Sequence, residues 1–194
     1  MDKIIILVVG EEKTGKTTVL NHVWDLLPSF SGKRILLDRK IQEILGVVDP
    51  CCKQRRGINR PLKIGVSSWG DTEELIQTGI IYLANEQCDV MICAAHTVNQ
   101  FLNALANLKD YSVDEDMKKE GISEDTLPHL KNELGKYRIV TFSPFTNYIE
   151  YGERKSIPSC TSQELYDNSH LEDINISRLS AETIVNLVDK LNAK

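Results

Sequence analysis

Residues 4–23, IIILVVGEEKTGKTTVLNHV, carry the strongest structural signal in the chain. They begin with an apolar run without polar alternation, which is typical of a strand buried on both faces. A polar segment with two glycines follows, and apolar residues then recur at helical spacing from about Gly15 to Leu27. Pro28 breaks that pattern. We therefore expect a buried strand over residues 3–9, a tight loop and a helix.

The overall composition is that of an ordinary globular domain. The chain has 194 residues, of which 41% are hydrophobic and 26% are charged, and this length suits a single domain over residues 1–194. The formal net charge of −5 disfavours a nucleic-acid partner, because proteins that grip phosphate backbones are usually basic. No apolar run approaches the roughly 20 residues that span a bilayer, so we expect no membrane partner. Acidic residues follow the short first apolar run, where a signal peptide would be cleaved, and we expect a cytoplasmic protein.

The cysteines predict neither a disulfide framework nor a zinc site, because their number is odd and no C-x-x-C occurs. Cys93 lies in an apolar run, which predicts a small buried side chain. Cys51 and Cys52 are adjacent in a polar segment, and partner ligands at metal spacing are missing. The complete set is Cys51, Cys52, Cys88, Cys93 and Cys160.

The rest of the chain alternates between strand-like and helix-like patterns. Apolar segments that predict strands lie at 34–38, 62–68, 88–95 and 138–143. Helical patterns lie at 39–46, where Gly46 ends the helix, at 71–86, in a broken stretch over 98–136, and in the closing amphipathic segment 180–194. Strands that alternate with helices predict an α/β fold: an open, mostly parallel sheet of five or six strands with helices on both faces.

Three further segments differ from this alternation. Residues 49–61 form a basic loop, and residues 144–172 are polar and irregular, as a lid would be. DINIS (173–177) is interpreted as a short strand before the closing helix.

The polar segment after the first strand has a specific spacing. Gly10 to Thr17, GEEKTGKT, match G-x-x-x-x-G-K-[ST] in full. Glycines let the main chain turn tightly and bring successive N–H groups around a concave nest. A helix that starts there points the positive end of its dipole into the nest. Lys16 supplies a positive charge for β- and γ-phosphates, and Thr17 supplies a hydroxyl for the Mg²⁺ that accompanies them.

With this motif the sequence resembles the P-loop NTPase superfamily, most strongly over residues 3–27. The closing stretch 173–191 is similar to the end of many small-molecule and nucleotide kinases of that class. The resemblance implies binding of ATP and Mg²⁺. Members that select guanine usually carry N-K-x-D after a late strand; this chain has NLKD at 107–110 instead, so ATP is favoured over GTP. The implied nucleotide-binding residues are Gly10, Glu11, Glu12, Lys13, Thr14, Gly15, Lys16, Thr17 and Thr18.

Two aspartates are candidates for the acid that supports the metal or the acceptor. Asp71 follows the predicted strand IGVSS, near where P-loop proteins usually place an acid beside Mg²⁺; alternatively it caps a helix in the pattern D-T-E-E, with Glu74 reaching back. Asp38 ends the predicted strand RILLD, at the edge where ligands bind in open α/β sheets. P-loop small-molecule kinases often use such an aspartate for the acceptor or the metal; the alternative is again a helix cap. The catalytic candidates are Lys16, Asp38 and Asp71, and the metal-ligand candidates are Thr17 and Asp71.

The basic loop is the candidate acceptor site. It contains CCKQRRGINRP, which concentrates Arg55, Arg56 and Arg60 in an otherwise acidic chain. Guanidinium groups bind phosphate or carboxylate bidentately, and P-loop kinases often hold the acceptor in this region. A small anionic acceptor is therefore expected. The alternatives are a solvated loop, or contact with a partner or nucleic acid.

Four other side chains have either a functional or a structural interpretation. Arg154 and Lys155 lie in the irregular segment and either cover the γ-phosphate as a lid or have no such role. His96 follows the strand 88–95 and either orients a nucleophile or phosphate or is an ordinary histidine at a strand end. Trp69 either stacks on a ring or covers the edge of the core.

The sequence thus favours an ATP-binding, Mg²⁺-dependent phosphotransferase that acts on a small anionic acceptor. The alternative is an ATP-hydrolysing switch or regulatory module that acts on a protein partner, and a third reading is a nucleotide-binding domain without useful turnover. The absence of a recognisable acceptor signature keeps the alternatives open.

Overall fold

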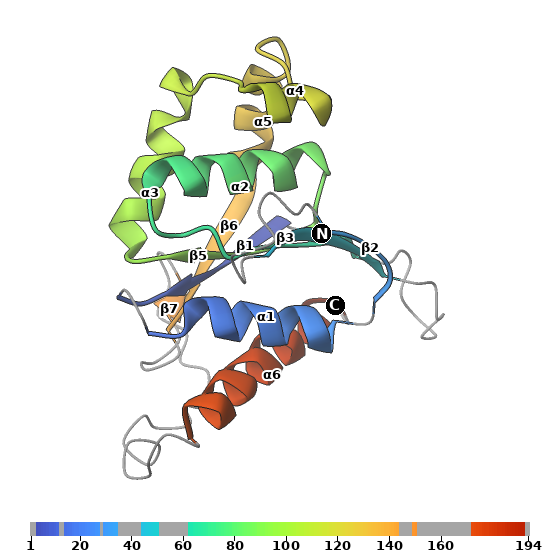
Figure 1. Ribbon diagram of the computed structural model, residues 1–194, viewed down its shortest axis with the longest axis vertical. Helices are drawn as coiled ribbons and strands as arrows, with labels where there is room; N and C mark the ends of the chain where they lie inside the picture. Colours follow the sequence, from blue (N-terminus) through green and yellow to red (C-terminus); the bar gives the residue numbers. More distant parts are fainter. Residues whose placement is uncertain are drawn as a thin grey trace.

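The structure is a computed structural model. It describes residues 3–11, 14–27, 29–34, 44–50, 62–143, 149–150 and 172–192. Within these residues a single sheet runs through the molecule, and helices cover both of its faces (Figure 1).

The sheet has seven strands in the described part of the chain, in the order β2-β3-β4-β5-β1-β6-β7. The strands are β1 (Lys3–Val9), β2 (Ser29–Arg34), β3 (Leu45–Pro50), β4 (Ile64–Ser67), β5 (Val90–Ala95), β6 (Tyr137–Phe142) and β7 (Ile149–Glu150). The four central strands are parallel, whereas β3 and β7 run in the opposite direction. Because β2 is antiparallel to β3, it runs in the direction of the central strands.

The helices form two layers, one on each face of the sheet. They are α1 (Lys16–Leu26), α2 (Glu73–Asn85), α3 (Val98–Ala106), the 3₁₀ helix η1 (Asn107–Asp110), α4 (Glu115–Lys119), α5 (Leu127–Leu134) and α6 (Glu172–Asn192). Figure 1 shows α1 and α6 on one face and α2 to α5 on the other. None of the described helices combines the length and the apolarity that crossing a bilayer requires.

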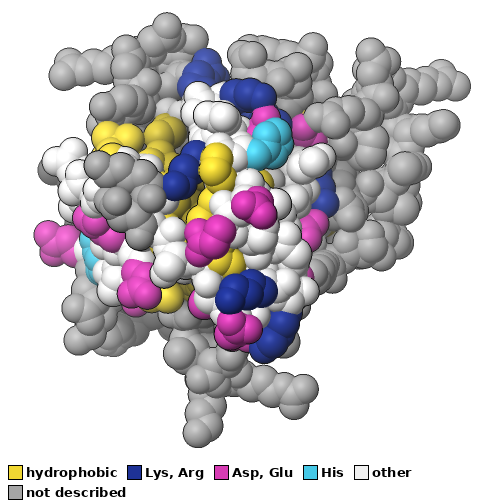
Figure 2. Space-filling view, turned by 90° about the horizontal axis from the view of Figure 1, so that it is seen from above, with side chains coloured by type: hydrophobic (Ala, Val, Ile, Leu, Met, Phe, Trp, Pro, Cys, Tyr) yellow, Lys and Arg dark blue, Asp and Glu magenta, His cyan; other side chains and the backbone are white. Residues whose placement is uncertain are grey.

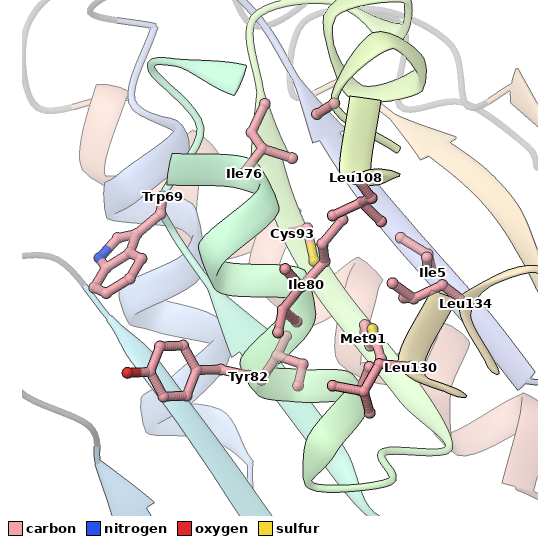
Figure 3. Packing of buried hydrophobic residues seen from close by; sticks show 14 of the residues in the cluster. Ile5, Trp69, Ile76, Ile80, Tyr82, Met91, Cys93, Leu108, Leu130 and Leu134 are labelled. Carbon is pink, nitrogen blue, oxygen red and sulfur yellow. The ribbon is translucent and has the colours of Figure 1, made fainter. Parts of the chain in front are cut away.

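Strand β1 lies at the centre because both of its faces are apolar. Ile6 pairs with Ile92 of β5 on one side and with Val140 of β6 on the other. Successive side chains of a strand point to opposite faces, so Ile4 and Ile6 join the core under α1 and α6, and Ile5 joins the core under α2 and α5. Figure 3 shows this second core, in which side chains from β1, β5, α2 and α5 pack together.

Most of the expected architecture is confirmed. The open α/β sheet is mostly parallel and has helices on both faces, as expected. The expected strand 3–9 is β1, the expected helix 71–86 is α2, and the stretch 98–136 is broken into α3, η1, α4 and α5. The reversed strands β3 and β7 bring the strand number to seven rather than five or six.

Three local expectations are wrong. Leu45 and Gly46 are not the end of a helix. They begin β3, in which Leu45 pairs with Ser67 of β4. That strand continues through Pro50, so the basic loop does not begin at residue 49. DINIS is helical, since it forms the first turns of α6. Once Ile184 and Val188 bury the helix against the sheet, each further helical residue adds one hydrogen bond at little cost.

Gly70 is a position where the fold has no room for a side chain. A Cβ at this residue would lie 2.6 Å from the carbonyl carbon and 2.7 Å from the carbonyl oxygen of Ala94. These are main-chain atoms of the buried strand β5, which cannot move aside cheaply. The glycine therefore lets the segment between β4 and α2 lie against the end of β5.

We predict that Gly70→Ala lowers the free energy of unfolding by about 1–3 kcal/mol, because it forces overpacking against β5. Urea denaturation measures this change. The matched control is Gly135→Ala, where the nearest atom to a new Cβ is the Asn132 carbonyl oxygen at 3.5 Å and φ is −63°. This control should be neutral or stabilising by up to about 1 kcal/mol. Equal losses in the two variants would contradict the prediction.

Candidate functional site

The loop between β1 and α1 is anchored to the neighbouring strand and to itself. Gly10 N donates to the carbonyl of Ala95, the last residue of β5, at 3.2 Å. Thr14 Oγ1 donates to the carbonyl of Glu11 at 2.8 Å, which closes the loop into a turn. The loop is therefore positioned by β5 at the carboxyl edge of the parallel strands. Glu12 and Lys13 lie outside the described residues.

The structure explains why both positions of the motif are glycine: Gly15 has a left-handed backbone conformation, and Gly10 has little room for a side chain. Gly15 precedes α1 with φ at +82°, in the left-handed region that favours glycine. It also brings no side-chain acceptor to the first amide groups of α1. A Cβ at Gly10 would lie 2.5 Å from Thr14 Oγ1, so a larger residue here would displace the hydroxyl that closes the loop. This arrangement leaves the start of α1 suited to an external anion.

Lys16 is buried, and its charge is held by the loop. Only 7% of the residue is exposed. Its Nζ donates to the carbonyls of Gly10 and Glu11, at 2.7 Å each. These charge-assisted hydrogen bonds offset the cost of desolvating the ammonium group. A positive charge is thus fixed at the loop and at the start of α1.

The two threonines that follow Lys16 lie in the first turn of α1. Thr17 is half-buried and Thr18 is exposed. The structure therefore brings Gly10, Glu11 and residues 14–18 together, as the motif predicts. No group of three or more His, Cys, Asp or Glu that could hold a metal occurs among the described residues. The donor chemistry suits Mg²⁺, because this ion binds through one or two protein oxygens together with phosphate oxygens and water.

Asp71 does not cap α2, contrary to one of its two sequence readings. The N-cap is Thr72, whose Oγ1 accepts a hydrogen bond from Leu75 N at 3.2 Å. The Asp71 side chain is 66% exposed, and its Oδ1 lies 3.6 Å from His96 Nε2. The structure therefore places the loops after β4 and β5 side by side at the carboxyl edge, with an acid and a histidine in contact.

Gln100 joins these two loops, and the sequence reasoning missed it. Its Oε1 accepts from His96 N at 2.8 Å, and its Nε2 donates to the Asp71 carbonyl at 3.1 Å. Gln100 N donates to Thr97 Oγ1 at 3.0 Å, which caps α3. The pattern Thr-x-x-Gln at 97–100 is a capping-box signal, so the sequence contained a cue to the cap but none to the bond with Asp71.

Trp69 is part of the core. Only 7% of it is exposed, and it belongs to the apolar cluster beside α2 (Figure 3). The neighbouring Ser68 accepts from Ile44 N at 2.8 Å through Oγ and donates its own N–H to the Ile44 carbonyl. Trp69 therefore covers the core, which was one of the two interpretations from the sequence. Its ring is not available for stacking on a ligand.

Several candidates lie outside the described residues. They are Asp38, Arg55, Arg56, Arg60, Arg154, Lys155 and the thiols Cys51, Cys52 and Cys160. The described neighbours of two of these segments nevertheless lie at different edges of the sheet. Leu45 pairs with Ser67 at the carboxyl edge, after the segment with Asp38, whereas Val48 pairs with Ile64 toward the amino edge, where the segment with the arginines is attached.

The surface over α4 and α5 mixes both signs of charge. Figure 2 shows acidic and basic side chains interspersed on this face. Two exposed pairs on α4, Lys118–Glu115 at 2.6 Å and Lys119–Asp116 at 2.5 Å, illustrate the pattern. A face of this kind gives no support to a nucleic-acid interface, which needs a basic surface.

Comparisons with known proteins do not place the chain in a family. No family model matches it, and no curated protein or solved structure matches it. The fold and the site together define an α/β protein with a glycine-rich, lysine-containing loop at the carboxyl edge of an open sheet.

The two described thiols are buried in the core beside α2. Burial raises the pKa of the Cys93 thiol to about 12, and burial also raises the pKa of the Cys88 thiol far above its ordinary value. Both are free cysteines. Because the thiolate is the reactive form, neither has the character of a nucleophile or a redox centre.

We predict that Cys88 and Cys93 do not react with a thiol-specific disulfide reagent in the native protein. In a variant with Cys51→Ser, Cys52→Ser and Cys160→Ser, labelling at about pH 8 should be at least about 100-fold slower than in denaturant, where both thiols react. Absorbance of the released reagent measures the rate. Rapid labelling of a variant whose circular dichroism matches the unmodified protein would contradict the burial of these thiols.

Proposed function

We propose that this chain binds Mg²⁺·ATP at Gly10–Thr18 and transfers the γ-phosphoryl group to a small anionic acceptor. The observation that carries the proposal is the buried ammonium of Lys16, which two main-chain carbonyls hold at the start of α1. A fixed cation beside a helix N-terminus is a binding site for a phosphate group.

The binding step rests on groups that are already in position. The loop is docked on Ala95 and closed by Thr14, so little reorganisation is needed when an anion arrives. Amide groups and an ammonium held in place by the protein stabilise charge better than mobile water does. The negative charge of a nucleotide's polyphosphate complements the Lys16 ammonium and the start of α1.

The residues present also fit the metal. Mg²⁺, when bound with the nucleotide, neutralises charge between the β- and γ-phosphates. Thr17 would hold it through its hydroxyl, and Asp71 would support it directly or through water. Thr17 lies one residue after the buried lysine, and the Asp71 side chain is largely exposed at the same edge of the sheet.

The transfer step needs a cation for the developing charge and a base for the acceptor. Lys16 supplies the cation. We assign the proton of the acceptor hydroxyl to Asp38, because the described residues nearest to it on either side, Arg34 and Ile44, lie at the carboxyl edge of the sheet with the loop.

We predict that Lys16→Met weakens binding of Mg²⁺·ATP about 10- to 150-fold, because one charge-assisted contact of about 1.5–3 kcal/mol is lost. Methionine keeps the aliphatic packing of the side chain. Isothermal titration calorimetry measures the affinity, and Lys118→Met on the exposed face of α4 is the control that should bind normally. Unchanged binding by Lys16→Met, or no binding of ATP or GTP by the unmodified protein, would overturn the nucleotide site.

We predict that an acceptor among phosphorylated or carboxylated metabolites raises ADP release from Mg²⁺·ATP at least about 10-fold. Asp38→Asn should lower this rate about 10²–10⁴-fold, since it removes a general base, while the affinity for ATP changes less than about 2-fold. Asp25→Asn, at an exposed position on α1, is the matched control.

A coupled ADP assay distinguishes the alternative function. The alternative is an ATP-hydrolysing switch. The hydrogen bond between Gln100 on α3 and the Asp71 carbonyl connects the site to a helix that a partner protein could contact. If no acceptor stimulates ADP release but a protein partner accelerates slow basal hydrolysis, the protein is a switch. If ATP binds and no ADP forms under either condition, it is a binding domain without turnover.

A further inference from the structure

We propose that Gln100 is a positioning residue for the metal side of the nucleotide site, an inference that rests on the proposed function. Its side chain is the bridge between two loops that end neighbouring strands. One end holds His96 N, which follows β5, and the other holds the Asp71 carbonyl, which follows β4. Gln100 itself is fixed because it belongs to the first turn of α3.

The bridge lies where the phosphate-binding loop is also supported. Gly10 N donates to the carbonyl of Ala95, and Gly70 lies against the carbonyl of Ala94. The last two residues of β5 therefore carry the loop after β1 on one side and the loop after β4 on the other. Gln100 adds the third connection, which ties Asp71 to the main chain that supports the loop after β1.

The side chain of Gln100 makes two different bonds, and Thr97 rather than Gln100 caps α3. The bond with His96 N needs only an acceptor, which glutamate would supply as well as glutamine. The bond to the Asp71 carbonyl needs a donor, which glutamate lacks. The choice of glutamine thus matches the bridge between both loops rather than the bond with His96 N alone.

Asp71 needs such a restraint in order to act on a metal. Its side chain is 66% exposed, and a mobile carboxylate contributes less to an ion than one held in place. The bond from Gln100 fixes the main chain of Asp71, and the contact with His96 limits its side chain. We therefore expect Gln100 to strengthen Mg²⁺-dependent binding without contacting the nucleotide.

Calorimetry measures the affinity for ATP twice, once in the presence of Mg²⁺ and once in a metal chelator. The ratio of the two affinities is the gain from Mg²⁺. Gln100→Met removes both bonds of the bridge without adding charge. It should leave the affinity in chelator within about 2-fold and lower the gain in affinity from Mg²⁺ about 3- to 10-fold. Gln100→Glu, which keeps the acceptor for His96 N, is the second variant and should also lower the gain.

The control is Thr97→Ala, which removes the cap of α3 but not the bridge. It should lower thermal stability and leave the gain from Mg²⁺ unchanged. In an Asp71→Asn background, Gln100→Met should cause no further loss, because residues that act through one another are not additive. An unchanged gain in Gln100→Met, or an equal loss in Thr97→Ala, would overturn this inference while ATP binding stands. Absence of ATP binding by the unmodified protein would overturn the proposed function and this inference with it.

Discussion

The constraint on which the structure depends is the burial of β1 on both faces and along both edges. Parallel strands β5 and β6 satisfy its main chain, and Ile4 to Val8 are all buried between two helical layers. A strand in that position cannot shift, so the chain must leave the sheet at Val9 in one defined direction. The loop that follows therefore starts from a fixed point, where Gly10 N donates to the Ala95 carbonyl.

The end of β5 brings three segments together at the carboxyl edge of the sheet. Three connections lean on the residues from Ala94 to His96: the loop after β1, the glycine turn after β4, and the first turn of α3. Two of them depend on a particular residue, since Gly70 has no Cβ and Gln100 carries both a donor and an acceptor. Three separate parts of the sequence thus meet at one edge of the sheet, and the sheet rather than the loops sets their spacing.

Segments whose pattern is decided locally could be predicted from the sequence. The apolar run of β1, the helical spacing of α1 and the apolar strand β5 needed no knowledge of their neighbours. The errors lie where a distant partner decides. Leu45 and Gly46 look like the end of a helix, yet pairing with β4 makes them strand, and DINIS alternates like a strand, yet α6 extends through it because its later turns are buried.

The candidate site divides in the same way. The spacing of Gly10, Gly15 and Lys16 is local and led directly to the loop, whereas the helix cap at residue 71 or 72 depends on which hydroxyl or carboxylate meets Leu75 N, and the letters D-T-E-E allow both. The direction of each strand was the property that the sequence indicated least. Because β3 is antiparallel, the chain before it is attached at the edge that carries the loop after β1, and the chain after it is attached at the opposite edge. One reversed strand therefore attaches the segment that contains Asp38 and the segment that contains Arg55, Arg56 and Arg60 at opposite edges of the sheet, which the sequence alone did not indicate.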